Sequence, residues 1–207
     1  MRKYNCIDKL LSFTTGYLHN EDSNTAYPAS EIAGPEPDHE QKKQSAQLMR
    51  INHAGEVSAQ GLYHGHAAIA RNPEIKALFL KSADEELNHL LWCEKRLIEL
   101  NDTKSVFTPL WYGCSFMLGY IAGLAGDEYS LGFIAATESL VEEHLQGHLD
   151  QLATKDPRSS AILKQMQDEE VQHQESAQNA GAVTFHPAAL IAMRMTSQVM
   201  IQVSKRL

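Results

Sequence analysis

The sequence predicts an all-α protein, in which a four-helix bundle carries an additional membrane-facing or C-terminal helix. Two general observations support this class. Runs in which Val, Ile and Thr alternate at period two are absent, so no sheet is expected, and prolines stand where long helices would begin. The chain has 207 residues, of which 43% are hydrophobic, and this is enough for one domain with a buried core.

Prolines, glycines and short polar stretches divide the chain into its predicted elements. A short helix is expected over residues 7–18, and the acidic, proline-containing stretch 20–37 is expected to be a linker. Residues 1–40 are therefore predicted to be a flexible N-terminal segment, and residues 41–207 a single helical domain. The helices of this domain are expected over residues 39–71, 73–100, 109–126, 128–152, 156–181 and 187–207.

One short motif occurs twice and adds the third observation. Residues 84–89 and 168–173 both read D-E-E-x-x-H. In each copy a Glu and a His stand three residues apart, so that both side chains lie on one face of a helix. A single copy is more often a pair of solvated charges, but two facing copies, with one further Glu from each of two more helices, form the di-iron site of ferritin-like bundles. The duplication therefore favours a ferritin-like di-iron domain.

The geometry of a helix hairpin locates the two further glutamates. In an antiparallel hairpin, residues equidistant from the turn face each other, and turns are expected near residues 71–73 and 154–157. Reflection through the first turn carries the first motif onto Glu56, and reflection through the second carries the other motif onto Glu138. The six candidate metal ligands are Glu56, Glu86, His89, Glu138, Glu170 and His173.

The charge of this ligand set fits two iron ions per chain. Four carboxylates balance two ferrous ions, and each histidine supplies one neutral nitrogen to an oxygen-rich site that suits iron. Glu86 and Glu170, which stand in the repeated motif, are expected to bridge the two ions, whereas Glu56 and Glu138 are expected to be terminal ligands. Asp84 and Asp168 are expected to orient the ligand histidines through the free ring N–H.

Other polar residues near the candidate ligands have less specific roles. His53 is a candidate hydrogen-bond partner of Glu56, and His144 is a candidate partner of the site or of its substrate. The remaining histidines and glutamates in these segments are expected to be mainly surface groups: His64, His66, His148, Glu85, Glu142, Glu143 and Glu169.

Composition excludes several classes of protein. A net charge of −8 argues against a nucleic-acid-binding protein. The three cysteines are scattered without a C-x-x-C pair, which argues against a disulfide framework or a rubredoxin-like iron centre and indicates a reducing compartment. A secretory signal is not expected in the first residues, because charged residues interrupt the short apolar run that follows the basic start.

Two apolar segments are unusual for a soluble bundle. Residues 105–126 contain no charged side chain. Three interpretations of this segment remain open: a bilayer span, a buried core helix, or a helix at a membrane surface or substrate channel. The last helix combines apolar residues with Arg194, Lys205 and Arg206, and lipid contact or ordinary core packing would both explain it.

Together these motifs resemble the bacterial demethoxyubiquinone hydroxylases of ubiquinone biosynthesis. The resemblance rests on residues 49–56, which read M-R-I-N-H-A-G-E, on the two E-x-x-H pairs and on residues 135–138, and it extends from about residue 45 to the C-terminus. The first 40 residues carry no motif of that family. The resemblance implies that the six candidate residues bind iron, and it implies a polyprenylated benzoquinol substrate that is hydroxylated with O2.

The resemblance also implies a location for the protein and candidate partners. A peripheral position on the cytoplasmic face of the inner membrane is expected, with other ubiquinone-biosynthesis proteins or a second copy of the chain as candidate partners and an electron donor that the sequence does not identify. The main alternative is a ferritin-like protein for iron storage or peroxide detoxification. A hydroxylase of a soluble substrate and a membrane-associated structural protein with a vestigial site are weaker alternatives.

Overall fold

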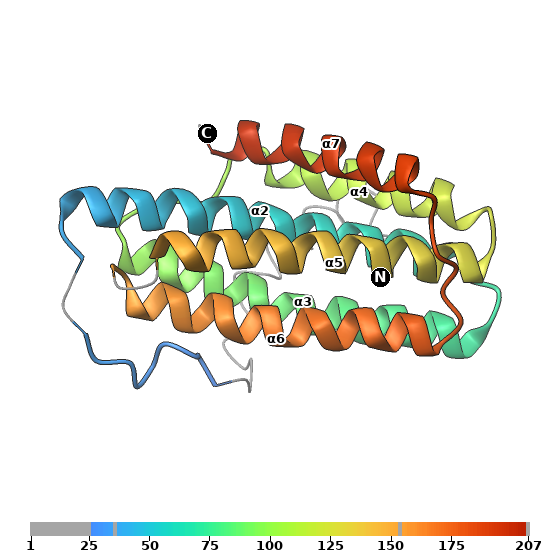
Figure 1. Cartoon of the computed structure of the whole chain (residues 1–207), viewed down its shortest axis with the longest axis horizontal. Coiled ribbons are helices and arrows are strands. Elements are labelled where there is room, and N and C mark those ends of the chain that lie inside the picture. The colour runs from blue at the N-terminus through green and yellow to red at the C-terminus, as the bar shows by residue number, and fades with distance from the viewer. Residues whose placement is uncertain (1–25, 35–36, 153–154, 206–207) are drawn as a thin grey trace, which may run out of the picture.

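The computed structural model describes residues 26–34, 37–152 and 155–205, and within these residues it contains only α helices (Figure 1). The predicted all-α class is confirmed. The predicted short helix over residues 7–18 lies outside the described residues. The helices are α2 (His39–Ile69), α3 (Pro73–Glu99), α4 (Thr108–Gly123), α5 (Asp127–Leu152), α6 (Pro157–Asn179) and α7 (Pro187–Ser204).

Capping side chains explain where α2, α3 and α6 begin. Asp38 and Gln41 form a capping box at the start of α2, in which each side chain bonds the other's backbone N–H. Asn72 and Asp156 cap α3 and α6, and in both cases proline occupies the first helical position. The sequence analysis used the prolines to predict where helices begin, and the predicted starts agree with the structure to within two residues.

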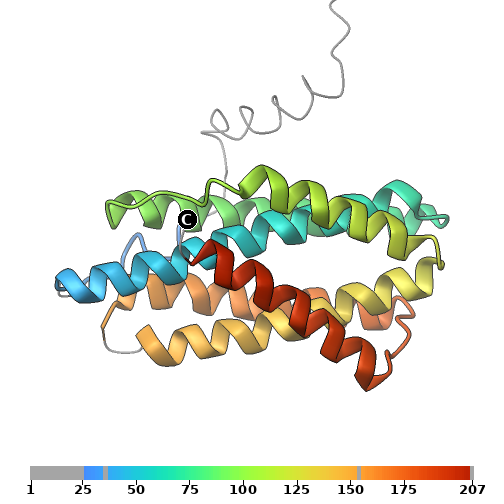
Figure 2. The ribbon, with the colours of Figure 1, turned by 90° about the horizontal axis from the view of Figure 1, so that it is seen from above.

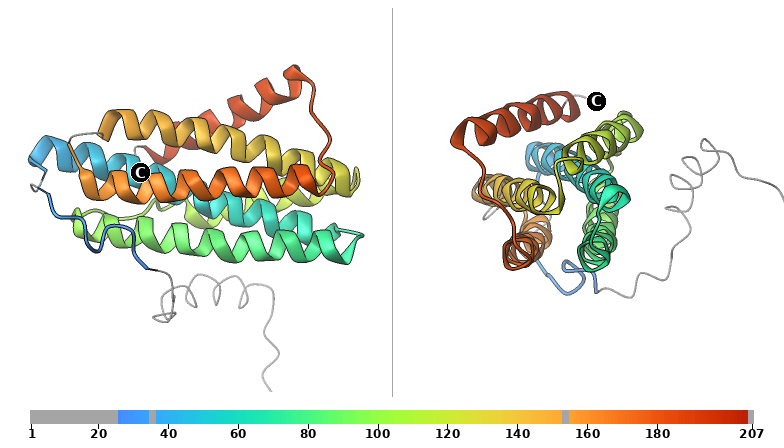
Figure 3. Two further views of the ribbon diagram at one scale, coloured as in Figure 1. Left: turned by 60° about the horizontal axis from the view of Figure 1, so that its bottom comes forward. Right: turned by 90° about the vertical axis from the view of Figure 1, so that its right-hand side faces the viewer.

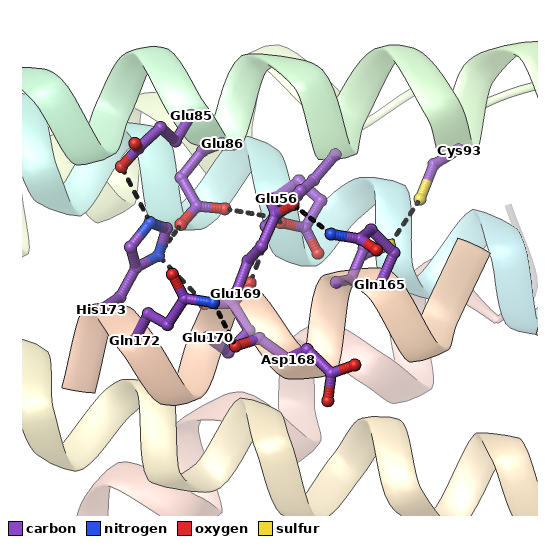
Figure 4. Close-up of polar contacts among 12 residues, drawn as sticks. Glu56, Glu85, Glu86, Cys93, Gln165, Asp168, Glu169, Glu170, Gln172 and His173 are labelled. Carbon is purple, nitrogen blue, oxygen red and sulfur yellow. Dashed lines mark hydrogen bonds and ion pairs between the residues drawn. The ribbon is translucent and has the colours of Figure 1, made fainter. Parts of the chain in front are cut away.

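Two helix hairpins form the four-helix bundle. α2 pairs with α3, and α5 pairs with α6, so that the two copies of the repeated motif face each other across the bundle on α3 and α6 (Figures 1 and 4). Buried apolar side chains form two clusters. One includes Met49, Leu97 and Leu163, and the other includes Leu62 and Ile134. Along each of the four bundle helices α2, α3, α5 and α6, the candidate ligands lie between the residues of one cluster and those of the other.

α4 and α7 form an outer layer on one side of the bundle (Figures 2 and 3). α4 lies directly on α2, because glycines let the two backbones touch: a Cβ added to Gly61 would come within 2.6 Å of the carbonyl oxygen of Tyr112. In α4 only Gly119 and Gly123 are buried. The buried-core alternative for this segment is therefore wrong. Among the described residues, no helix has both the length and the hydropathy to cross a bilayer.

α7 is held more loosely than α4. Ser204 is its only buried residue, and Ile191, Met195 and Val199 are at least 60% exposed. α7 is thus not an ordinary core helix, and its apolar residues divide between an exposed stripe and a side that faces α2 and α5.

A part of the predicted N-terminal linker contacts the bundle. The hydroxyl of Tyr27 donates to Glu99 over 3.2 Å, and Ala29 is fully buried in one of the two core clusters. The flexibility of the remainder of residues 1–40 stays a prediction.

Candidate metal centre

The structure brings the six candidate ligands together at mid-length of the bundle. Each of them is at most 7% exposed. They form two overlapping groups in which every ligand atom lies within 4.8 Å of the others, and Glu86 and Glu170 belong to both groups. Glu56 and His89 complete the first group, which we call position A. Glu138 and His173 complete the second, which we call position B.

The same ring nitrogen of both histidines faces the carboxylates. His89 Nδ1 lies 3.2 Å from an oxygen of Glu86 and 3.2 Å from an oxygen of Glu170. His173 Nδ1 lies 3.0 Å from the other oxygen of Glu86, and Figure 4 shows these two side chains converging from α3 and α6. The three-residue spacing within each motif therefore places an imidazole beside a carboxylate that the opposite helix also reaches.

The other ring nitrogen of each histidine has a carboxylate partner from the opposite helix. His89 Nε2 donates to Glu169 Oε2 over 2.7 Å, and His173 Nε2 donates to Glu85 Oε2 over 3.2 Å. The predicted role of Asp84 and Asp168 in orienting the histidines is therefore wrong, as is the prediction that Glu85 and Glu169 are mere surface charges. Both aspartates are exposed.

The geometry of the bundle explains this correction. The middle residue of each D-E-E run lies next to a ligand Glu on the face that borders the neighbouring motif helix, so it reaches the histidine of the other copy. Asp168 instead lies on the outer face, where it pairs with Lys164 at 2.8 Å. The duplication of the motif was the available sign that the two motif helices face each other. The spacing of residues within one helix does not show which side chain of the other helix each histidine contacts.

Burial and crowding of four carboxylates dominate the electrostatics. Burial, and then the charges of Glu86 and Glu170, raise the pKa of Glu138 well above its usual value. Burial disfavours a charged His173, but hydrogen bonds with Glu170 and Glu86 outweigh it and raise the pKa of His173 to about 11. The cluster therefore attracts positive charge.

Several buried atoms of the cluster are suited to a metal. In the part of the chain that the structure describes, Glu138 Oε2 accepts no hydrogen bond, and the one neighbour recorded for Glu86 Oε1 and Glu170 Oε2 is His173 Nδ1, at 3.0 and 3.4 Å. Buried polar atoms without a partner are rare and costly, and metal ligation would satisfy them. The donor set of carboxylate oxygens and imidazole nitrogens fits iron.

Other histidines differ from the prediction. His66 is fully buried between the rings of Phe79 and Phe133, so its predicted surface position is wrong. His148 is 4% exposed and donates from Nδ1 to Asn52 Oδ1 over 3.0 Å, so it is not a surface group either. Burial lowers the pKa of His66 to about 4, and burial with the neighbouring His144 lowers that of His148 to about 3.

His53, His64 and His144 have intermediate outcomes. His53 is 1% exposed, but within the described residues its ring nitrogens have no hydrogen-bond partner, so its predicted bond to Glu56 is not formed. His64 is half-buried and its Nδ1 lies 3.0 Å from the Tyr112 hydroxyl. His144 lies beside His148, with ring centroids 4.0 Å apart, and lines the cavity described next.

A largely apolar cavity of about 590 Å³ adjoins the ligand cluster. Its walls come from α2, α4, α5 and α7, and include Trp111, Leu118, Met193 and Met200. Glu56 is the one candidate ligand among its lining residues. The sequence indicated a substrate channel as one alternative for residues 105–126, but it did not reveal that α7 supplies the second wall.

Comparison with known proteins agrees with this geometry. The family described as "Ubiquinone biosynthesis protein COQ7" matches residues 43–204. The 3-demethoxyubiquinol 3-hydroxylase of Psychrobacter sp. (strain PRwf-1) is 51% identical over 176 residues, which cover 85% of this chain and 83% of that protein. The protein of the same name from Acinetobacter baylyi is 44% identical over 212 residues and covers 99% of both chains. The predicted resemblance is confirmed, and the chain belongs to the COQ7 family of ubiquinone biosynthesis proteins.

Proposed function

We propose that the protein is a di-iron monooxygenase that hydroxylates a polyprenylated demethoxybenzoquinol with O2 in ubiquinone biosynthesis. The observation that carries the proposal is the pair of overlapping ligand groups, buried in a bundle of the COQ7 family next to an apolar cavity. Relatives that match most of the chain are named 3-demethoxyubiquinol 3-hydroxylase, which supports this reaction over others of the di-iron class.

The six ligand residues would hold two irons per chain. Glu56 and His89 would bind one ion, Glu138 and His173 the other, and Glu86 and Glu170 would bridge both. When bound, the irons supply the activation of O2 and the electron transfers that amino-acid side chains do not provide. The protein's own contribution is to exclude water and to fix the histidine rings through Glu85 and Glu169.

The cavity is the proposed binding site of the quinol. Its apolar walls suit a benzoquinol ring and the first prenyl units, and Glu56 brings the ring next to the ligand cluster. Because α4 and α7 form the outer walls, the prenyl tail would leave between these two helices.

We further propose that this outer layer lies on the cytoplasmic face of the inner membrane. Exposed apolar side chains follow one edge of α4, among them Met117 and Ile121, and one edge of α7, among them Ile191 and Met195. Both helices lie on the same side of the bundle (Figure 2), and we take their two stripes together as the proposed membrane-facing surface. A bilayer would deliver a water-insoluble substrate directly to the cavity.

One detail of the expected lipid contact is revised. Arg194 forms an exposed, bidentate ion pair with Glu143 at 2.6 and 2.9 Å, so a lipid phosphate would have to compete for it. On the apolar side of α7, Val199 belongs to the exposed stripe, whereas Ile201 lines the cavity.

Vesicle binding tests the membrane proposal. We expect Met195→Asp to reduce sedimentation with anionic liposomes, because it puts a charge in the apolar stripe. Ile98→Asp is the matched control, since Ile98 of α3 is 68% exposed but does not belong to the outer layer. Equal binding by the two variants would contradict the proposal.

Product analysis tests the reaction. With a reductant and ¹⁸O2, the iron-loaded protein should convert a demethoxybenzoquinol into a product that has gained one oxygen atom, present as an ¹⁸O-labelled hydroxyl group. Oxygen taken from water would refute the monooxygenase assignment. Rapid oxidation of ferrous iron to a mineral core without product would support the iron-storage alternative instead.

A further inference from the structure

The two halves of the ligand cluster are related by the repeat, so a difference between them is informative. Seven residues after Glu56, two turns along the same face of α2, stands Tyr63. Seven residues after Glu138, at the equivalent place on α5, stands Leu145. The repeat therefore provides a phenol on one side of the cluster and a side chain without any hydrogen-bonding group on the other.

Tyr63 reaches across the bundle to position B. Its hydroxyl donates to Glu138 Oε1 over 2.7 Å, and the residue is only 1% exposed. Its ring packs against Phe79, at a centroid distance of 6.3 Å, and edge-on against His173 at 6.1 Å. Because the ring is enclosed, the phenol holds Glu138 Oε1 in place, and Oε2, which has no hydrogen-bond partner among the described residues, stays available to a metal.

Glu56 has a different environment at position A. Its one ion-pair contact within the described chain is with His89 Nδ1, at 3.5 Å, which is longer than a good hydrogen bond. It also lines the apolar cavity, which Glu138 does not. Among the described residues, no hydroxyl group donates to the carboxylate of position A, and this carboxylate lies next to the space from which a substrate would approach.

We infer that the two metal positions are functionally different: Tyr63 is a positioning residue that fixes Glu138 and keeps position B closed, whereas position A, with Glu56, is the one that meets the substrate. This inference rests on the proposed function. It assigns Tyr63 a role in ligand geometry, and it assigns Glu56 the freedom to shift when the quinol occupies the cavity.

Anaerobic titration of the metal-free protein with Co²⁺ tests the role of Tyr63. Loss of a hydrogen-bond partner of a metal ligand typically lowers metal affinity about 10–100-fold. We expect Tyr63→Phe to weaken one of the two sites by this factor and to leave the other unchanged. The same substitution should weaken the remaining site of a His89→Ala protein, but not that of a His173→Ala protein. Phe79→Leu is the control, because it disturbs the same core cluster and keeps the phenol.

Mössbauer spectra of the fully loaded diferrous protein give a second readout. Wild-type protein with ⁵⁷Fe should show two quadrupole doublets of equal area, and a short-chain demethoxybenzoquinol should shift one of them. Tyr63→Phe should shift the other. A substrate that shifts both doublets, or a Tyr63→Phe change on the doublet that substrate shifts, would overturn the inference, and the first of these outcomes needs no folded variant.

These results separate the inference from the proposed function. Wild-type protein that fails to bind two irons or to hydroxylate the quinol contradicts the proposed function. Wild-type protein that does both, while Tyr63→Phe leaves both cobalt affinities unchanged, contradicts only the inference.

Discussion

Glu169→Gln tests whether carboxylates from the opposite helix set the metal affinity. The wild-type carboxylate accepts from His89 Nε2 over 2.7 Å and is 28% exposed, so it is a partly buried, charge-assisted partner of a ligand imidazole. Gln keeps the size of the side chain but removes its charge. Removal of such a partner typically costs 10–100-fold in metal affinity, or about 1.4–2.8 kcal/mol. We expect this loss at position A, which contains His89, with little change at position B.

Asp168→Asn is the matched control for this prediction. It removes one negative charge at the preceding residue, but Asp168 is 54% exposed and pairs with Lys164 on the surface. Its effect on metal affinity should be below twofold, because exposed charges are strongly screened. The assay is competition with a chromogenic chelator at constant pH. Equal losses in Glu169→Gln and Asp168→Asn would show that overall charge determines affinity, and would refute the reasoning from the hydrogen bond.

Three further predictions concern the ligands, the packing of α4 and the buried histidines. Glu86→Ala should lose both irons together, whereas Glu56→Ala should weaken one more than the other, as measured by iron analysis; retention of two irons in Glu86→Ala would contradict the bridging role. Gly119→Ala should destabilise the protein by about 1–3 kcal/mol in urea unfolding, because its Cβ would lie 2.5 Å from a backbone oxygen of α2. Gly113→Ala, with open space around it, should be neutral or stabilising. Burial lowers the pKa of His66 to about 4, so between pH 6.5 and about 4 the unfolded chain binds a proton that the folded chain does not. In this range the wild-type protein loses up to about 1.4 kcal/mol of stability per pH unit as the pH falls. His66→Phe should make this pH dependence flatter. An unchanged slope in the urea midpoint against pH would contradict this.

The sequence contained enough information to locate the cluster of candidate ligands, because the spacing of these residues follows the periodicity of helices and hairpins. The i, i+3 pair fixes a helix face, and reflection through a turn fixes the facing residue of a hairpin, so Glu56 and Glu138 followed from arithmetic on residue numbers. Both hairpins are closed by short turns at prolines, which keeps this arithmetic accurate to about one helical turn. The spacing of residues along the chain was therefore sufficient to predict which residues face each other within a hairpin.

Contacts between the hairpins were not accessible in the same way. Glu85 and Glu169 reach histidines on the opposite motif helix, and the rotation of α3 against α6 decides this contact. His66 was expected at the surface because nothing in its own helix indicates that the rings of Phe79 and Phe133 enclose it. Such contacts depend on how one hairpin packs on the other, which spacing along the chain does not encode.

Glycines determine the position of α4 on α2, and a search for hydrophobic periodicity does not detect them. Gly61 and Gly65 on α2, and Gly119 and Gly123 on α4, form two G-x-x-x-G pairs, a spacing that puts small residues on one helix face and allows close backbone approach. Because glycines occupy the buried edge of α4, its large apolar side chains can only lie on the other edges. The packing that attaches α4 to α2 thereby also produces the exposed apolar stripe and one wall of the cavity. α4 is therefore apolar on its exposed face, because the face toward α2 must carry glycines for the two backbones to meet.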